Sequence, residues 1–365
     1  MSQIKKYTLK KILFAITLVL IVSSCLVVLY KNQDSKVSAF SEKESTEYID
    51  KYANSIKFNG SIFIAQKGKV LLSKAYGMSN KEAKIPNTTQ TKFLIGSITK
   101  QFTALSIMQL EEKGLLDVND KIDKYIIGFP HGKEITIHQL LSHTSGLPRD
   151  IQAEIKLDSM PKTLEEALNM IKGKNIDLVC SPGEKFNYSN SGYILLGYII
   201  EKVSGKTYSD YLQENIFTPL KMDNSGFGYN RKENKELAVG YTNHLAKQET
   251  PNDFYDFSVA PFSGGGIYST AEDLYKWDRA LYTKQLVSKK TLNTIYTPVK
   301  SNYGYGWLIS KDINNTTYHH NGNVLGFSSQ IIRQVDKDVL IVVLSNEDNM
   351  SYEYMSQRLG KLINK

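Results

Sequence analysis

The sequence predicts an α/β (α+β) fold, in which N- and C-terminal segments form one antiparallel sheet that is flanked by helices, with an all-helical insertion between them. Two observations predict it. Runs rich in β-branched and aromatic residues occur near both ends of the chain, and the part between them, about residues 115–292, shows helical periodicity and loops. Because a two-stranded hairpin is only marginally stable by itself, we expect the N-terminal hairpin to join the C-terminal strands.

The N-terminal elements are justified by local signals. Residues 41–58 begin with a capping-box pattern and carry apolar residues at helical spacing, which predicts an amphipathic helix packed on the domain. Residues 60–77 contain two β-rich runs around a Lys-Gly-Lys turn, which predicts a hairpin. An apolar helix should then begin at or near Ser97 and end before Gly114, a residue suited to the left-handed position after a helix.

The later elements follow the same reasoning. Thr136 should cap a short helix, residues 191–205 should form a buried one, and Ser269 with Glu272 matches a capping box at the start of a third. Strand-like runs then occupy residues 303–310, 327–335 and 338–346, and a polar helix should end the chain.

Composition places the chain among globular proteins, with 41% hydrophobic and 22% charged residues. A length of 365 residues suits one large domain or two interlocked ones. Four of the lysines behind the net charge of +8 precede the first apolar run, so the remainder is only mildly basic. That bias is too weak to indicate nucleic acid as a partner.

The first apolar run, residues 12–30, has 19 residues and no charge, which nearly spans a hydrocarbon core. The lysines before it predict a cytoplasmic segment at 1–11, a membrane contact through 12–30, a polar linker at 31–40 and an extracytoplasmic domain at 41–365. We favour an uncleaved anchor, because the apolar run continues past Cys25. Lipidation of Cys25 and cleavage after Ala39 remain open, and would give a lipoprotein or a secreted form.

Ser97 and Lys100 are the first pair of residues that suggests chemistry. A serine at a helix start lies among unpaired N–H groups, and a lysine three residues later falls on the same helix face. Burial would lower the pKa of that lysine, so that its neutral amine could activate the serine hydroxyl. The pattern alone is weak, because a capping serine followed by an ordinary lysine gives the same letters.

Two further groups strengthen the interpretation. Tyr188 and Asn190 lie in a turn before a buried helix, where a phenol can move a proton and an amide can hold a substrate carbonyl. His320 and Gly322 enter a strand, and the glycine lets a ligand approach the strand edge.

In this order, GSITK, YSN and HNG resemble the three motifs of the penicillin-recognising serine hydrolases, nearest to the class C β-lactamase and D-alanyl-D-alanine carboxypeptidase branch. Flanking stretches such as IHQLLSHTSGLP and GGGIYSTAEDLYKW also resemble that branch, from about Gly60 to Asn346. The resemblance implies a β-lactamase/transpeptidase-like fold and makes 41–365 a serine hydrolase domain.

The resemblance also implies roles. Ser97 would be acylated, while Lys100 and Tyr188 would share the proton transfers. Four residues would bind the substrate. Asn190 would orient the substrate amide, and His320 with Gly322 would line the wall of the site opposite the serine helix. The N–H group of Asn323 would join that of Ser97 in the oxyanion hole. No metal and no cofactor is expected.

One residue departs from the pattern: His320 stands where class C β-lactamases have a lysine. Histidine is mostly neutral near pH 7, so it offers a substrate carboxylate no permanent cation. The substrate expected from the resemblance is therefore a D-alanyl peptide or ester of the cell wall, of peptidoglycan or teichoic-acid type, or a related small molecule. A β-lactamase and a slow-turnover penicillin-binding sensor remain alternatives, and the oligomeric state is not predicted.

Overall fold

One antiparallel sheet organises the molecule. The computed structural model describes residues 42–150, 163–172, 176–228, 230–231, 234–242, 250–251, 262–313, 315–324, 326–348 and 359. The sheet has the strand order β10-β11-β12-β13-β1-β2. Its strands are β1 (Gly60–Gln66), β2 (Lys69–Tyr76), β10 (Leu308–Lys311), β11 (Thr316–Val324), β12 (Phe327–Gln334) and β13 (Val339–Ser345).

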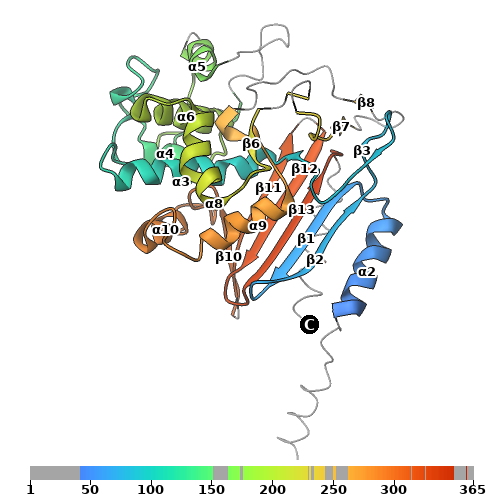
Figure 1. Cartoon of the computed structure of the whole chain (residues 1–365). Helices are drawn as coiled ribbons and strands as arrows, with labels where there is room; N and C mark the ends of the chain where they lie inside the picture. Colours follow the sequence, from blue (N-terminus) through green and yellow to red (C-terminus); the bar gives the residue numbers. More distant parts are fainter. Residues whose placement is uncertain are drawn as a thin grey trace, which may run out of the picture.

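The two ends of the chain meet in the middle of this sheet. Strand β1 pairs with β13 from Gly60↔Ser345 to Gln66↔Val339, and β2 forms the outer edge next to β1. The predicted union of the N-terminal hairpin with the C-terminal strands is therefore confirmed, and with it the fold class (Figure 1).

Both faces of the sheet are covered, because β13 is buried at all seven positions. Leu340, Val342 and Leu344 join the large core beneath the helices. The alternate residues Val339, Ile341 and Val343 join a smaller core with α2 (Glu42–Ser55), which lies on the opposite face (Figure 1). The period of two along a strand thus divides one apolar run between two layers.

Helices from the middle of the chain cover the other face. The helical elements of this part are η2 (Ile122–Lys124), α4 (Ile137–Leu141), α5 (Leu164–Lys172), α6 (Asn190–Ser204), α7 (Tyr208–Leu212), η5 (Gln213–Phe217), α8 (Thr218–Leu220), η6 (Phe262–Gly264), α9 (Ala271–Ala280) and α10 (Lys289–Ile295). Helix α9 contacts β1 and β13, so it joins this helical layer to the sheet.

The insertion differs from an all-helical segment, because it also contains short strands. Strand β9 (Ile267–Ser269) pairs with β5 (Phe93–Leu94) on one side and with β6 (Gly226–Phe227) on the other, and β7 (Tyr241–Thr242) pairs with β8 (Thr250–Pro251). A separate pair consists of β3 (Met78–Asn80) and β4 (Ile85–Pro86). Strands of two or three residues are too short to show an alternating pattern, so sequence periodicity cannot find them.

The cap of α9 is also shifted by one residue from its predicted place. Thr270 caps the helix by accepting the N–H of Asp273, at 3.2 Å. Ser269 instead ends β9, where its hydroxyl contacts that of Ser225 at 2.8 Å.

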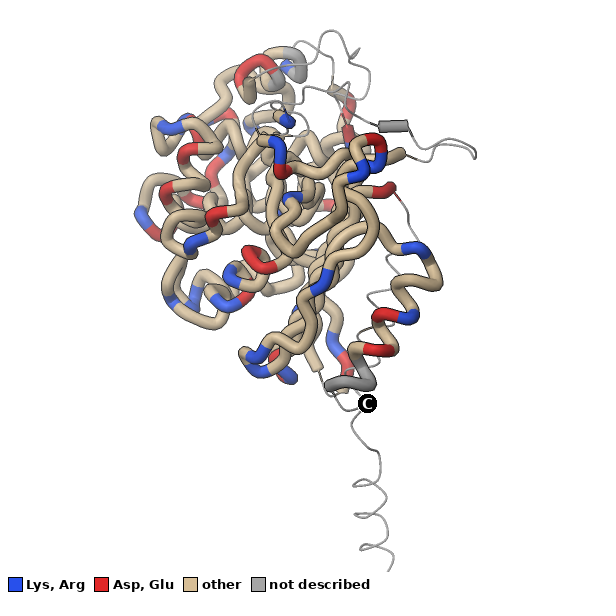
Figure 2. Tube along the Cα trace, turned by 45° about the vertical axis from the view of Figure 1, so that its right-hand side comes forward, with Lys and Arg blue, Asp and Glu red and all other residues tan. Residues whose placement is uncertain are grey.

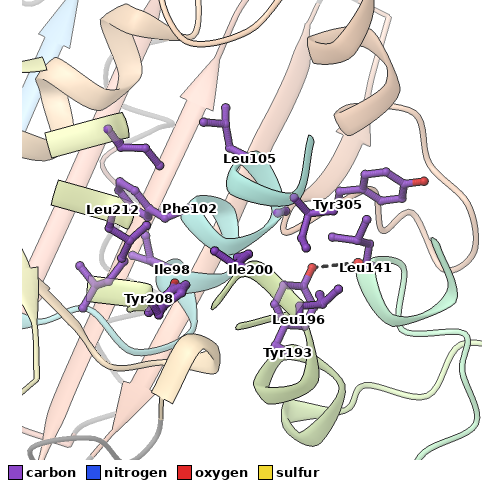
Figure 3. Close-up of a cluster of buried hydrophobic side chains, with 14 of the residues drawn as sticks. Ile98, Phe102, Leu105, Leu141, Tyr193, Leu196, Ile200, Tyr208, Leu212 and Tyr305 are labelled. Carbon is purple, nitrogen blue, oxygen red and sulfur yellow. Dashed lines mark hydrogen bonds between the residues drawn. The ribbon is translucent and has the colours of Figure 1, made fainter. Parts of the chain in front are cut away.

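The helix that carries the site is central to the large core. It begins as η1 (Gly96–Ile98) and continues as α3 (Thr99–Glu112), whose residues from Thr99 to Leu110 are all buried. Figure 3 shows Phe102 and Leu105 of α3 among side chains of α6 and α7, with the Tyr193 hydroxyl donating to the Leu141 carbonyl at 2.8 Å. Gly114 follows α3 with φ of +68°, as the sequence predicts.

Several sequence predictions lie outside the described residues. The predicted segments at 1–11, 12–30 and 31–40 all do. Within the described part of the chain, no helix is both long and apolar enough to cross a bilayer. Nearly all of the predicted C-terminal helix is also outside, apart from Leu359, which is buried in the smaller core.

Candidate active site

Ser97 lies in the one-turn helix η1, between β5 and α3. The preceding residue, Gly96, has φ of +51°, and a Cβ on it would lie 2.8 Å from the backbone nitrogen of Asn323. Glycine is thus required there both by the backbone angle and by the close approach of β11. This contact holds the serine against the strand that carries the HNG residues.

Lys100 is fully buried, and its Nζ lies 3.0 Å from Ser97 Oγ, 2.8 Å from Asn190 Oδ1 and 2.6 Å from the Gly264 carbonyl oxygen. Two of these three neighbours are carbonyl oxygens, which can only accept a proton. A neutral amine that donates to both of them has its lone pair left for the Ser97 hydroxyl. The geometry therefore suits a base directed at Ser97.

The charge state of Lys100 agrees with that geometry. Burial lowers its pKa to about 7, the Asp150 carboxylate acts in the opposite direction, and the Arg149 guanidinium adds to the lowering. A substantial fraction of the amine is thus neutral at neutral pH, which a solvated lysine is not.

Tyr188 lies in the loop just before α6, and its phenol interacts with the Ser97 side chain. Burial raises the pKa of Tyr188 to about 12, and the interaction with Ser97 only partly opposes it. Lys100 Nζ is 5.0 Å from the centre of the Tyr188 ring. The phenol is therefore neutral near pH 7, and it can donate a proton rather than start as a phenolate.

Asn190 is the first residue of α6, and both ends of its amide are engaged. Its Oδ1 accepts from Lys100, and its Nδ2 donates to Asp150 Oδ1 at 2.7 Å. The carboxylate of Asp150 thereby fixes which end of the amide faces the lysine. Asp150 is joined at the site by Arg149, whose guanidinium carbon is 5.2 Å from the Tyr188 ring centre.

His320 lies on β11 and is buried. Its Nδ1 is 2.7 Å from the Asn321 carbonyl oxygen, so Nδ1 carries the proton, and Nε2 accepts from the Tyr303 hydroxyl at 3.2 Å. Burial, with a smaller effect of Lys100, lowers the pKa of His320 to about 3. The histidine is therefore neutral, and its ring centre is 6.3 Å from that of Tyr188.

Gly322 and Asn323 complete this strand wall. A Cβ on Gly322 would lie 2.0 Å from the Ile95 carbonyl oxygen, so only glycine lets β11 approach η1 so closely. The Asn323 side chain is exposed and donates to Asp348 Oδ1 at 2.6 Å, while its backbone nitrogen lies next to Gly96.

The structure thus brings together all seven residues that the sequence singled out. It adds Arg149, Asp150 and Gly264, which sequence reasoning missed. Arg149 and Asp150 follow a Leu-Pro turn and belong to no motif that the sequence analysis used. Gly264 begins the stretch GGGIYSTAEDLYKW, whose resemblance to the family was the available signal, but it acts through its backbone carbonyl, which a sequence pattern does not show.

No metal site is formed by the described residues, where no group of three or more His, Cys, Asp or Glu side chains could hold an ion. Cys180 is a buried free thiol. Along the described part of the chain trace, basic and acidic residues are interspersed (Figure 2).

Comparison with known proteins decides the family. The family model described as Beta-lactamase matches residues 52–361. The chain belongs to the β-lactamase family. Members of this family are serine hydrolases, and so this β-lactamase-family protein is an enzyme of that kind.

Its relatives include penicillin-binding proteins. The protein is 33% identical to penicillin-binding protein 4* of Bacillus subtilis (strain 168) over 319 residues, which cover 81% of this chain and 70% of that one. It is 32% identical to the putative penicillin-binding protein PbpX of the same strain, over 92% of this chain and 84% of that one. The crystal structure of FmtA from Staphylococcus aureus superposes with a TM-score of 0.77 at 29% identity, covering 89% of this chain and 88% of that one.

Proposed function

We propose that this β-lactamase-family protein hydrolyses D-alanyl peptides or esters of the cell wall through an acyl-enzyme on Ser97. The observation that carries the proposal is the environment of Lys100. A fully buried amine with a pKa of about 7, in contact with the Ser97 hydroxyl and two carbonyl oxygens, is arranged as a general base.

In the proposed first step, neutral Lys100 takes the proton of Ser97 while Oγ attacks the substrate carbonyl carbon. The N–H groups of Ser97 and Asn323 receive the developing oxyanion. Tyr188, whose phenol is neutral, donates its proton to the leaving group as the carbonyl–leaving group bond breaks, and the proton held by Lys100 restores the phenol.

In the second step, a water molecule attacks the ester carbonyl and passes its proton back through the same two groups. Ser97 leaves with a proton, and the enzyme returns to its starting state. An amine acceptor in place of water would make the reaction a transfer.

The neutral state of His320 supports the choice of substrate. With a pKa of about 3, His320 supplies no cation at the position where the class C β-lactamases, which this sequence resembles, have a lysine. A β-lactam carboxylate would therefore lose a favourable contact, whereas a D-alanyl ester or peptide carbonyl needs only the hydrogen bonds around Ser97.

We further propose that residues 12–30 attach the protein to the membrane and place the hydrolase domain outside the cell. The absence of charge in this run and the lysines before it support that location. Carbonate extraction of cell membranes would test it, since an anchor or lipid stays with the membrane and a cleaved protein does not.

A comparison of three substrates tests the function. We expect the full-length protein to turn over a D-Ala-D-Ala peptide or a D-alanyl ester, to turn over a chromogenic cephalosporin much more slowly, and to lose all turnover as Ser97→Ala. Lys100→Ala should slow acylation by at least about 10²-fold, the scale of lost general-base catalysis.

The other outcomes would contradict the proposal. Fast cephalosporin turnover alone would make the protein a β-lactamase. A penicillin adduct on Ser97 that persists for hours, without turnover of any substrate, would make it a sensor. If the Lys100→Ala variant kept its full activity, the assignment of Lys100 as the general base would be wrong.

A further inference from the structure

Tyr188 lies in a loop, yet its phenol must stay within reach of Ser97. Loops rarely position a reacting group well unless another element holds them. Side chains of Asn187 and Ser189 donate to the Leu147 and Pro148 carbonyl oxygens, each at 2.7 Å. His143 accepts two further hydrogen bonds, both from backbone N–H groups next to Tyr188. The N–H of Asn187 donates to the His143 carbonyl oxygen at 2.7 Å, and the N–H of Ser189 donates to His143 Nδ1 at 3.1 Å.

His143 therefore binds the backbone immediately before and immediately after Tyr188. Its ring also lies against the Tyr188 ring, with centres 4.1 Å apart and planes inclined by 33°. On its other sides the His143 ring contacts Tyr193 and Tyr303, with centres 5.0 and 4.7 Å away. The imidazole is completely buried within this aromatic cluster.

The protonation state of His143 is fixed by these contacts. Because Nδ1 accepts an N–H, the proton must be on Nε2, and Nε2 has no hydrogen-bond partner among the described residues. Leaving a buried donor unpaired is unfavourable. Burial and the nearby cation of Lys100 keep the pKa of His143 well below its usual value, so the ring remains a neutral acceptor.

The backbone of His143 is also unusual, with φ of +55°. Residues other than glycine are uncommon there, and asparagine and histidine are tolerated better than most. A buried histidine with an unpaired donor and a left-handed backbone is a poor choice for packing alone. Of its ring contacts, the one with Tyr188 is the shortest, and both hydrogen bonds that it accepts come from the neighbours of Tyr188.

We propose that His143 is a positioning residue that holds the Tyr188 phenol beside Ser97, where the phenol donates its proton to the leaving group. It fixes the tyrosine by the backbone on both sides and by the face of the ring. This inference rests on the proposed role of Tyr188, and it makes His143 act only through that hydroxyl.

A double-mutant cycle in the full-length protein tests it. The variants are His143→Leu, His143→Asn, Tyr188→Phe and the two His143 changes combined with Tyr188→Phe. The rate of acylation by a fluorescent penicillin is measured for each, with thermal unfolding to confirm folding. The control is His138→Asn, which removes a histidine of α4 that bonds Tyr305 at 2.6 Å, outside the site.

We expect His143→Leu to slow acylation by between about 10-fold and 100-fold, the scale produced by misplacing a reacting group. His143→Asn should recover part of that loss, because its amide oxygen can accept the Ser189 N–H and its backbone tolerates positive φ. In the Tyr188→Phe background, where no hydroxyl remains to be placed, His143→Leu should change the rate by less than about 2-fold. His138→Asn should leave the rate unchanged.

Two contrary results are distinguishable. Suppose that Tyr188→Phe slows acylation and that His143→Leu slows the Tyr188→Phe variant by the same factor as it slows the wild type. The positioning role is then wrong while the proposed function stands. If Tyr188→Phe acylates as fast as the wild type, the proposed role of Tyr188 is wrong and the inference fails with it.

Discussion

At the scale of single residues, the reactivity of Lys100 depends on two neighbours of opposite charge. Asp150 raises the pKa of the lysine and Arg149 lowers it, against the larger lowering by burial. Neither residue has to touch the substrate for this effect. The neighbouring charges therefore tune the pH at which the amine becomes a base.

This predicts two pH profiles that move in opposite directions. Lys100 acts when neutral, so acylation is lost as the pH falls through its pKa of about 7. Asp150→Asn should move this acid limb to lower pH, and Arg149→Gln should move it to higher pH, each by up to about one unit. Penicillin acylation rates between pH 5 and 9 measure both.

The matched control is Asp120→Asn, which removes a carboxylate bonded to Lys124 and Tyr125 outside the site. The acid limb of the pH–rate profile of this variant should stay where it is in the wild type. If Asp150→Asn and Arg149→Gln shifted the limb in the same direction, Lys100 would not be the group that titrates.

Where a motif exists the sequence could single out residues, as for Ser97, Lys100 and Tyr188, and the structure brings these three together. The protonation states could not be predicted. They depend on burial and on Arg149, Asp150 and Gly264, which are brought together only by folding. The neutral phenol of Tyr188 is one such result, because the sequence indicates only that a phenol at this position can move a proton.

At the scale of elements, the close contact between η1 and β11 places the serine beside the strand wall. Gly96 and Gly322 make this possible, since a Cβ on either would meet backbone atoms of the other element. The two oxyanion donors of the proposed mechanism, the N–H groups of Ser97 and Asn323, come from these two elements.

Gly96→Ala should therefore impair both stability and acylation. Gly128→Ala is the control, because Gly128 also has a positive φ, of +72°, but a Cβ there would meet nothing within 4 Å. We expect Gly96→Ala to cost roughly 1–3 kcal/mol more unfolding free energy than Gly128→Ala. Urea unfolding and penicillin acylation measure the two effects, and equal behaviour of the two variants would show that the η1–β11 contact is unimportant.

The hairpin of β1 and β2 was predictable from its two β-rich runs, and the short helix α4 was predictable from its cap at Thr136. The short strands β6 and β9 and the one-residue shift of the α9 cap were not. Their positions are set by the pairing of β9 with β5 and β6 and by the contact of Ser269 with Ser225, which are tertiary interactions.

At the scale of the whole molecule, a buried ion pair joins the helical layer to the sheet. Arg333 of β12 donates to Asp278 of α9 at 2.5 Å, and both side chains are buried. Arg279 also donates to Asp278 and to Asp338, nearer the surface. The position of the helical layer on the sheet thus depends partly on these charges.

Asp278→Leu should leave the buried Arg333 charge without its partner and lower the unfolding free energy by about 3–5 kcal/mol. The double variant Asp278→Leu with Arg333→Leu should recover part of that loss, because no unpaired charge remains. Asp338→Asn, which affects only the partly exposed pair, should cost less than about 1 kcal/mol. Urea unfolding measures all three, and a double variant less stable than Asp278→Leu would contradict this account.

The overall architecture was predictable because the N-terminal hairpin is only marginally stable alone and gains partners by pairing with the C-terminal strands. The register from Gly60↔Ser345 onward was not, since it depends on which β13 side chains face each of the two cores.

The central claim is that Ser97 is the residue acylated. Intact-mass measurement of the full-length protein after reaction with penicillin, followed by peptide mapping, tests it most directly. The account predicts one adduct, located on Ser97, that is absent in Ser97→Ala and forms at least about 10²-fold more slowly in Lys100→Ala. An adduct on any other residue, or an equal adduct on Ser97→Ala, would contradict it.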